Sequence, residues 1–140
     1  MVIRFFSDGV SFHLKDKRKI SQWIKQVAAK EGKKTGSLSY IFVSDEIILD
    51  MNKKYLQHDD YTDIITFDDS SVSTISGEMY ISIDTVKSNA IEYQTDFRNE
   101  LLRVIVHGVL HLCGHNDKSL VEQQEMRSAE EKYLNEMSES

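Results

Sequence analysis

Two histidines one helical turn apart, His107 and His111, are the residues whose types and spacing most directly suggest chemistry. On a helix, positions i and i+4 lie about 40° apart around the axis and about 6 Å apart along it. Both imidazole rings can therefore reach one metal ion. The alternative is a pair of core histidines, each with a hydrogen-bond partner, because a buried imidazole without a partner is costly.

Two further candidate ligands follow in the sequence. The helix is expected to end in a left-handed turn at Gly114, which directs His115 away from the face that carries the two histidines. Asp117, two residues further along, can then fold back toward that face. We therefore expect His107, His111 and Asp117, rather than His115, to hold a metal. Three protein ligands leave one position for water, as in catalytic zinc sites.

The expected ion is zinc, one per chain, and two imidazoles with one carboxylate also suit Mn²⁺, Fe²⁺ or Ni²⁺. Gly108 stands where zinc proteases with the H-E-x-x-H motif have their catalytic glutamate, so the sequence does not have the motif of that class. The small size of Gly108 indicates close backbone packing or room for a substrate.

The helix that must position these residues, Asp96–Cys113, is expected to be largely buried, because apolar side chains surround it almost completely. Glu100 and Arg103 extend its polar stripe toward the N-terminal end. They are interpreted either as groups that support the metal ligands or bind substrate, or as a buried ion pair.

The other predicted elements interleave strands with helices. Strands are expected at Val2–Phe5 with Val10–Phe12, at Ser37–Val43, at Ile64–Phe67 and at Glu78–Ile83, and helices at Lys17–Glu31, Asp45–Tyr55, Asp84–Tyr93 and Leu120–Met137. This pattern predicts an α+β fold in which helices cover a small mixed sheet, as a single domain over residues 1–140. Thr62 and Asp63, just before a strand, either line the cleft or cap the loop, and we favour capping.

The composition fits one ordinary globular domain, with 140 residues, 40% hydrophobic content, six Gly and no Pro. It excludes disordered and collagen-like chains, and a single Cys gives no internal disulfide. Arg4, Asp8 and His13 interrupt the apolar core that a signal peptide needs, and no stretch is long enough for a membrane span. We expect a cytoplasmic protein without membrane contact.

The charge is unevenly distributed. The net charge is −6, yet eight of the seventeen basic residues lie between Lys15 and Lys34. A basic patch on one side of an acidic protein can bind phosphates, and Lys17 and Arg18 are the candidates. The alternative is a solvated helix face.

Three sequence blocks together resemble one known family. His107–Asp117, with the sequence HGVLHLCGHND, closely resembles the signature H-G-x-L-H-L-x-G-x-D-H of the YbeY family. Met51–Phe67 and Gly77–Ser82 are similar to two further blocks of that family. The final helix resembles the family's closing helix through Glu122 or Glu125 and through Met126, Glu130, Glu131 and Leu134. The resemblance covers the chain from about Ile20 to its end.

Members of the YbeY family are described as bacterial rRNA maturation factors and metal-dependent endoribonucleases. The resemblance implies a four-stranded mixed sheet with about five to six helices and a zinc site in a cleft. It also implies cleavage of single-stranded RNA, with ribosomal RNA and the small ribosomal subunit as partners. The expected roles are maturation of the 3′ end of 16S rRNA and late quality control of the 30S subunit.

This chain departs from the family pattern at two positions. Asp117 stands where the family has its third histidine, and a carboxylate is an accepted zinc ligand. Leu56 replaces an arginine expected to hold a phosphate. Three residues are candidates for that lost contact, namely Lys53, Lys54 and His58.

The resulting hypothesis assigns a role to each candidate. His107 and Arg103 are the expected catalytic residues, and the expected RNA-binding residues are Lys17, Arg18, His58 and His115. A monomer is favoured. Two alternatives remain open: a non-catalytic ribosome-assembly factor with a structural metal, and a metal-dependent hydrolase of small substrates.

Overall fold

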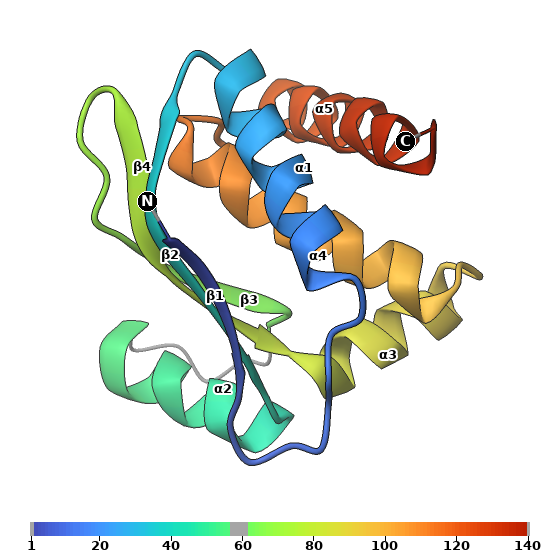
Figure 1. Cartoon of the computed structure of the whole chain (residues 1–140). Helices are drawn as coiled ribbons and strands as arrows, with labels where there is room; N and C mark the ends of the chain where they lie inside the picture. Colours follow the sequence, from blue (N-terminus) through green and yellow to red (C-terminus); the bar gives the residue numbers. More distant parts are fainter. Residues whose placement is uncertain (1, 57–61, 140) are drawn as a thin grey trace.

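A mixed sheet of four strands forms the centre of the fold (Figure 1). The computed structural model describes residues 2–56 and 62–139. The strands lie side by side in the order β1 (Val2–Ser7), β2 (Lys34–Val43), β4 (Thr74–Ser82) and β3 (Ile64–Asp68). β1, β2 and β4 are parallel, whereas β3 is antiparallel to β4. The predicted fold class, α+β with a four-stranded mixed sheet, is confirmed.

Helices cover both faces of this sheet. Those found in the described residues are α1 (Lys17–Lys30), α2 (Asp45–Met51), α3 (Ile83–Glu92), α4 (Phe97–Leu112) and α5 (Leu120–Glu139), with a π-helical turn, η1 (Asn52–Leu56), that continues α2. Successive side chains of a strand point to opposite faces of the sheet. Tyr40 and Phe42 of β2 accordingly join the main core beneath α1 and α4, and Ile41 and Val43 join a smaller core against α2.

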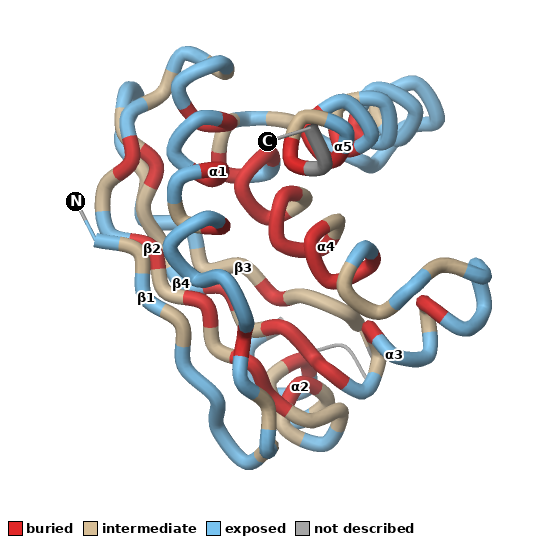
Figure 2. Tube along the Cα trace, turned by 45° about the vertical axis from the view of Figure 1, so that its right-hand side comes forward, coloured by how far each residue is buried: buried red, intermediate tan, exposed pale blue. Residues whose placement is uncertain are grey.

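Helix α4 lies between the sheet and α5 and is buried along most of its length (Figure 2). The Asp96 side chain caps its first turn by accepting a 2.6 Å hydrogen bond from the backbone N–H of Asn99. The helix ends as expected before Gly114, whose φ of 108° is in the range that favours glycine. Gly108 faces the sheet, and a Cβ there would stand 2.9 Å from Sδ of Met79. Gly108 therefore allows the close packing that its size indicated.

The expected strand at Val10–Phe12 is wrong. The chain leaves the sheet after Ser7, and residues 11–14 form neither strand nor helix. Phe12 instead packs its ring edge-on against Phe42 and Phe97, with centroid distances of 5.0 and 5.8 Å. The alternating apolar side chains that resembled a strand therefore serve to anchor a loop over the core.

The strand predicted to begin at Glu78 begins earlier, at Thr74. The cause is a compact turn in the β3–β4 hairpin, where the Ser70 hydroxyl accepts a 3.0 Å hydrogen bond from the backbone N–H of Ser76. Part of the serine-rich segment between the two predicted strands therefore belongs to β4.

A carboxylate at the end of α1 joins three segments of the chain. Glu31 Oε1 accepts a 2.6 Å hydrogen bond from Nε2 of His115, in the loop after α4, and Oε2 accepts one of 2.5 Å from the hydroxyl of Tyr133 on α5. Burial acts to raise the pKa of Glu31, but the hydrogen bonds from Tyr133 and His115 outweigh it and hold that pKa below its ordinary value of 4.5. The Glu31 carboxylate therefore stabilises the packing of α1 against α5 and the loop.

We expect Glu31→Gln to lower the free energy of unfolding near neutral pH by about 1–2 kcal/mol, because it weakens two hydrogen bonds to a charged group. A carboxylate whose pKa is lower in the folded chain stabilises the fold above its unfolded pKa, and this contribution is lost as the pH falls through the folded value. The variant should therefore lose less stability than the wild type below about pH 4.5. Chemical denaturation across the acid range measures both effects.

The matched control is Glu92→Gln, which changes an exposed glutamate at the end of α3. This control should behave as the wild type at every pH. Equal acid sensitivity of Glu31→Gln and the wild type would contradict the proposed contribution of Glu31.

Candidate active site

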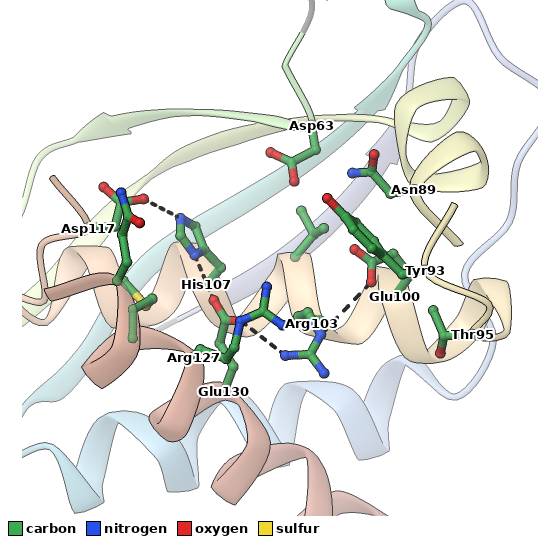
Figure 3. A pocket seen from close by; sticks show the side chains of 13 residues that line it. Asp63, Asn89, Tyr93, Thr95, Glu100, Arg103, His107, Asp117, Arg127 and Glu130 are labelled. Carbon is green, nitrogen blue, oxygen red and sulfur yellow. Dashed lines mark hydrogen bonds and ion pairs between the residues drawn. The ribbon is translucent and has the colours of Figure 1, made fainter. Parts of the chain in front are cut away.

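A cavity of about 630 Å³ lies between α4 and α5 and reaches the end of α3 and the loop before β3 (Figure 3). Glu100, Arg103 and His107 line it from α4, at positions i, i+3 and i+7 of one helical face. Arg127 and Glu130 line it from α5. The polar stripe predicted on the buried helix therefore faces a cavity over most of its length.

Both ring nitrogens of His107 face a carboxylate. Nδ1 donates a 2.8 Å hydrogen bond to Glu130 Oε2, and Nε2 lies 3.5 Å from Asp117 Oδ2. Burial acts to lower the pKa of His107, but the hydrogen bond and negative charge of Glu130, with smaller contributions from Asp63 and Asp117, raise it above its ordinary value. The ring is thus held in one orientation, with Nε2 directed toward Asp117.

The guanidinium of Arg103 is held by three carboxylates. It donates a 3.2 Å hydrogen bond to Glu130 Oε1 and another to Glu131, and its Nε lies 3.9 Å from Glu100 Oε1. Glu100 and Arg103 form the expected ion pair, and Arg103 also contacts the carboxylate that holds His107. Because Glu130 is bonded to both Arg103 and His107, a single buried carboxylate fixes two of the residues that line the cavity.

Two further carboxyl groups of the cavity have shifted pKa values. Burial raises the pKa of Asp63, although the nearby His107 opposes this. Burial also raises the pKa of Glu100, against the effect of Arg103. The side chain of Asp63 lines the cavity, whereas its neighbour Thr62 donates a 3.5 Å hydrogen bond to the carbonyl of Ile64. The capping interpretation fits Thr62 but is wrong for Asp63, which lines the cavity.

The three residues predicted to bind a metal are not all close to one another. Asp117 lies beside His107, but His111, one turn further along α4, is exposed, and its ring makes no hydrogen bond or ion pair with other described residues. Across residues 2–56 and 62–139, no three His, Cys, Asp or Glu side chains are arranged as a metal site. His115 is outside the cavity lining, and its ring is bonded to Glu31.

The predicted RNA-binding residues lie away from the cavity where the structure describes them. Lys17 and Arg18 are exposed at the start of α1 and border a shallow hollow beside β1. Lys53 and Lys54 are exposed on η1. His58 is outside the described residues.

The cavity contains residues whose role the sequence did not reveal. Only the family resemblance points to Glu130, and no sequence pattern described above indicates a role for Arg127. A signal was nevertheless present, because Gln123, Arg127 and Glu130 share one face of α5 at positions i, i+4 and i+7 and all line the cavity. Residue types alone do not distinguish this face of α5, because the helix is polar over most of its surface.

Comparison with known proteins extends over nearly the whole chain. The family model described as Endoribonuclease YbeY matches residues 7–138. The chain is 50% identical to the endoribonuclease YbeY of Parabacteroides distasonis over 134 residues, which cover 96% of this chain and 94% of that protein. It is 48% identical to the endoribonuclease YbeY of Bacteroides thetaiotaomicron, covering 96% of this chain and 98% of the relative.

The fold also has a counterpart among solved structures. A protein from Thermotoga maritima with a known solution structure superposes with a TM-score of 0.69 at 28% identity, covering 97% of this chain and 89% of the other. In the described residues, no helix is both long and apolar enough to cross a membrane. Because the family model and the curated relatives both span almost the entire sequence, the chain belongs to the YbeY endoribonuclease family.

Proposed function

We propose that this protein is a metal-dependent endoribonuclease that cuts single-stranded RNA in the maturation of the 16S rRNA 3′ end and in late 30S quality control. The observation that carries the proposal is the fixed imidazole of His107, whose Nδ1 is bonded to Glu130 and whose Nε2 faces Asp117 beside an open cavity. Membership of the YbeY endoribonuclease family supports RNA as the substrate.

The proposed cofactor is one zinc ion per chain, with another divalent transition metal as the alternative, held by His107, His111 and Asp117. The donor chemistry of these residues fits, because a ligating histidine commonly donates its other ring N–H to a carboxylate, as His107 does to Glu130. Asp117 lies next to the remaining nitrogen. When bound, the ion supplies a Lewis acid near the phosphate oxygens of the substrate.

Side chains of α4 and α5 orient the His107 ring and place a charged group at the cavity. Glu130 keeps the His107 ring in place, and Arg103, the second proposed catalytic residue, holds Glu130 through its guanidinium, a positive group fixed at the cavity wall. A phosphodiester that develops negative charge during cleavage is stabilised by such fixed positive groups.

Contacts with more distant parts of the RNA are proposed for Lys17, Arg18, His58 and His115. Lys17 and Arg18 are exposed and able to meet phosphates on the flank of the molecule. The proposed partners are ribosomal RNA and the small ribosomal subunit, with the protein acting as a monomer in the cytoplasm.

We expect the purified protein to cut single-stranded ribosomal RNA internally and His107→Ala to reduce the rate roughly 100-fold or more, because a positioned acid–base or ligand group is lost. His13→Ala is the matched control, since His13 is exposed and outside the cavity. Denaturing gels of a 16S rRNA 3′-end precursor provide the measurement.

Each alternative function gives a different result in this assay. A wild-type protein that binds ribosomal RNA without cutting it would support the non-catalytic assembly factor. Hydrolysis of small esters or peptides with no RNA cleavage would support the small-substrate hydrolase. Either outcome contradicts the proposed nuclease.

Metal binding is tested separately by elemental analysis after gentle purification, with about one zinc ion per chain expected in the wild type. His107→Ala, His111→Ala and Asp117→Ala should lose the metal, and Asp117→His should keep it because three imidazoles form a common zinc site. His115→Ala should retain the wild-type content, since its ring is bonded to Glu31. Full metal content in His111→Ala, or an empty site in His115→Ala, would refute the proposed ligand set.

A further inference from the structure

The cavity contains two guanidinium groups, and their surroundings differ. The charge of Arg103 is balanced by Glu130, Glu131 and Glu100. The side chain of Arg127 is exposed and forms no ion pair among the described residues, although its charge acts on Glu100 and favours the ionised form of that carboxyl. A guanidinium that faces a cavity without a hydrogen-bonded protein partner can bind a phosphate through two parallel hydrogen bonds.

Arg127 lies close to His107, the proposed catalytic residue, on the neighbouring helix. It stands three residues before Glu130 on α5, so the two side chains share one helical face about one turn apart. Since Glu130 is bonded to the ring of His107, Arg127 belongs to the wall that fixes this histidine. Figure 3 shows Arg127 with Glu130 on the α5 side of the cavity.

An exposed aromatic side chain lines the cavity at the end of α3. Tyr93 follows the last residue of α3 and lines the cavity, although 62% of it is exposed. In Figure 3, Tyr93 and Asp117 lie on opposite sides of His107 and Arg103, and Asn89 lies beside Tyr93. Among the described rings, Tyr93 has no aromatic partner. Exposed aromatic rings in grooves commonly stack on the bases of single-stranded nucleic acids.

The charges of the cavity separate its two ends. Asp117 lies beside His107 at one end of the cavity, and the Asp63 carboxyl, between His107 and Asn89 in Figure 3, adds negative charge near His107 that suits a cation. Arg127, which forms no ion pair among the described residues, lies on the wall leading to Tyr93. Glu100 at this end is paired with Arg103, and Asn89 adds an amide that can donate and accept hydrogen bonds. A volume of about 630 Å³ is in the range of sites that bind small organic molecules, so it accommodates a nucleotide.

We propose that the part of the cavity between Arg127 and Tyr93 is a nucleotide subsite for single-stranded RNA, in which Arg127 binds a backbone phosphate and Tyr93 stacks on a base. This inference rests on the proposed endoribonuclease function and specifies how one nucleotide beside the cut is held. The base is bound through its aromatic face, so the subsite accepts every base.

The test is the equilibrium binding of a short fluorescent single-stranded RNA oligonucleotide, followed by anisotropy over a range of salt concentrations. Denaturing gels confirm that the oligonucleotide is intact during the measurement. Arg127→Gln should weaken binding roughly tenfold at low salt and reduce the slope of log K against log salt concentration by about 0.7, the value for one phosphate contact on a single strand.

Tyr93→Leu should also weaken binding roughly tenfold, but without changing the salt slope, because stacking releases no counterions. Tyr93→Phe should restore the affinity, since the phenyl ring stacks equally well. The control, Lys87→Gln, removes one positive charge from an exposed position of α3 outside the cavity and should leave both affinity and slope unchanged. Thermal denaturation confirms that every variant folds.

Failure of the subsite and failure of the proposed function give different results. If the wild type binds and cuts RNA but Arg127→Gln keeps the wild-type slope, or Tyr93→Leu keeps its affinity, the subsite is wrong and the nuclease stands. If the wild type binds RNA without cutting it, the nuclease is wrong, and the variants still decide on the subsite. A wild type that does not bind single-stranded RNA overturns both.

Discussion

The carboxylate of Glu130 is the interaction on which the candidate site depends. It is buried between α4 and α5, and its two oxygens bond Arg103 at 3.2 Å and His107 at 2.8 Å. A buried carboxylate is costly without partners, so the burial of Glu130 favours the placement of α5 in which both Arg103 and His107 reach it. The same contact that joins two helices therefore sets the orientation of the imidazole that faces the cavity.

The fold makes this arrangement possible through the close packing of α4. Gly108 lets the helix approach β4, and the helix buries its apolar residues against the sheet and the neighbouring helices. The polar stripe of α4 is excluded from this apolar core and faces the cavity beside α5. The polar stripe of α5, which includes Arg127, meets it there. A cavity with Asp117 and His107 at one end and Arg127 and Tyr93 toward the other suits a cation and a nucleotide together.

Much of this architecture could be predicted from local patterns in the sequence. The burial of α4, its polar stripe and its end before Gly114 follow from side-chain periodicity and from the backbone freedom of glycine, and all three are observed. The role of Glu130 could not be predicted, because it depends on a contact 23 residues away in the sequence. The same reason explains His115, whose partner is 84 residues away. Local patterns set each helix face, whereas the packing of α5 and α1 decides which polar residues meet.

The most direct test of this account is the tautomer of His107, measured from the ¹H–¹⁵N correlations of its ring at a pH above its pKa. A hydrogen bond to the Glu130 carboxylate requires a proton on Nδ1 and leaves Nε2 unprotonated toward Asp117. The account predicts this tautomer in the wild type and a mixture of both tautomers in Glu130→Ala, which removes the acceptor. A wild-type ring protonated mainly on Nε2, or a tautomer that Glu130→Ala leaves unchanged, would contradict the central place given to Glu130.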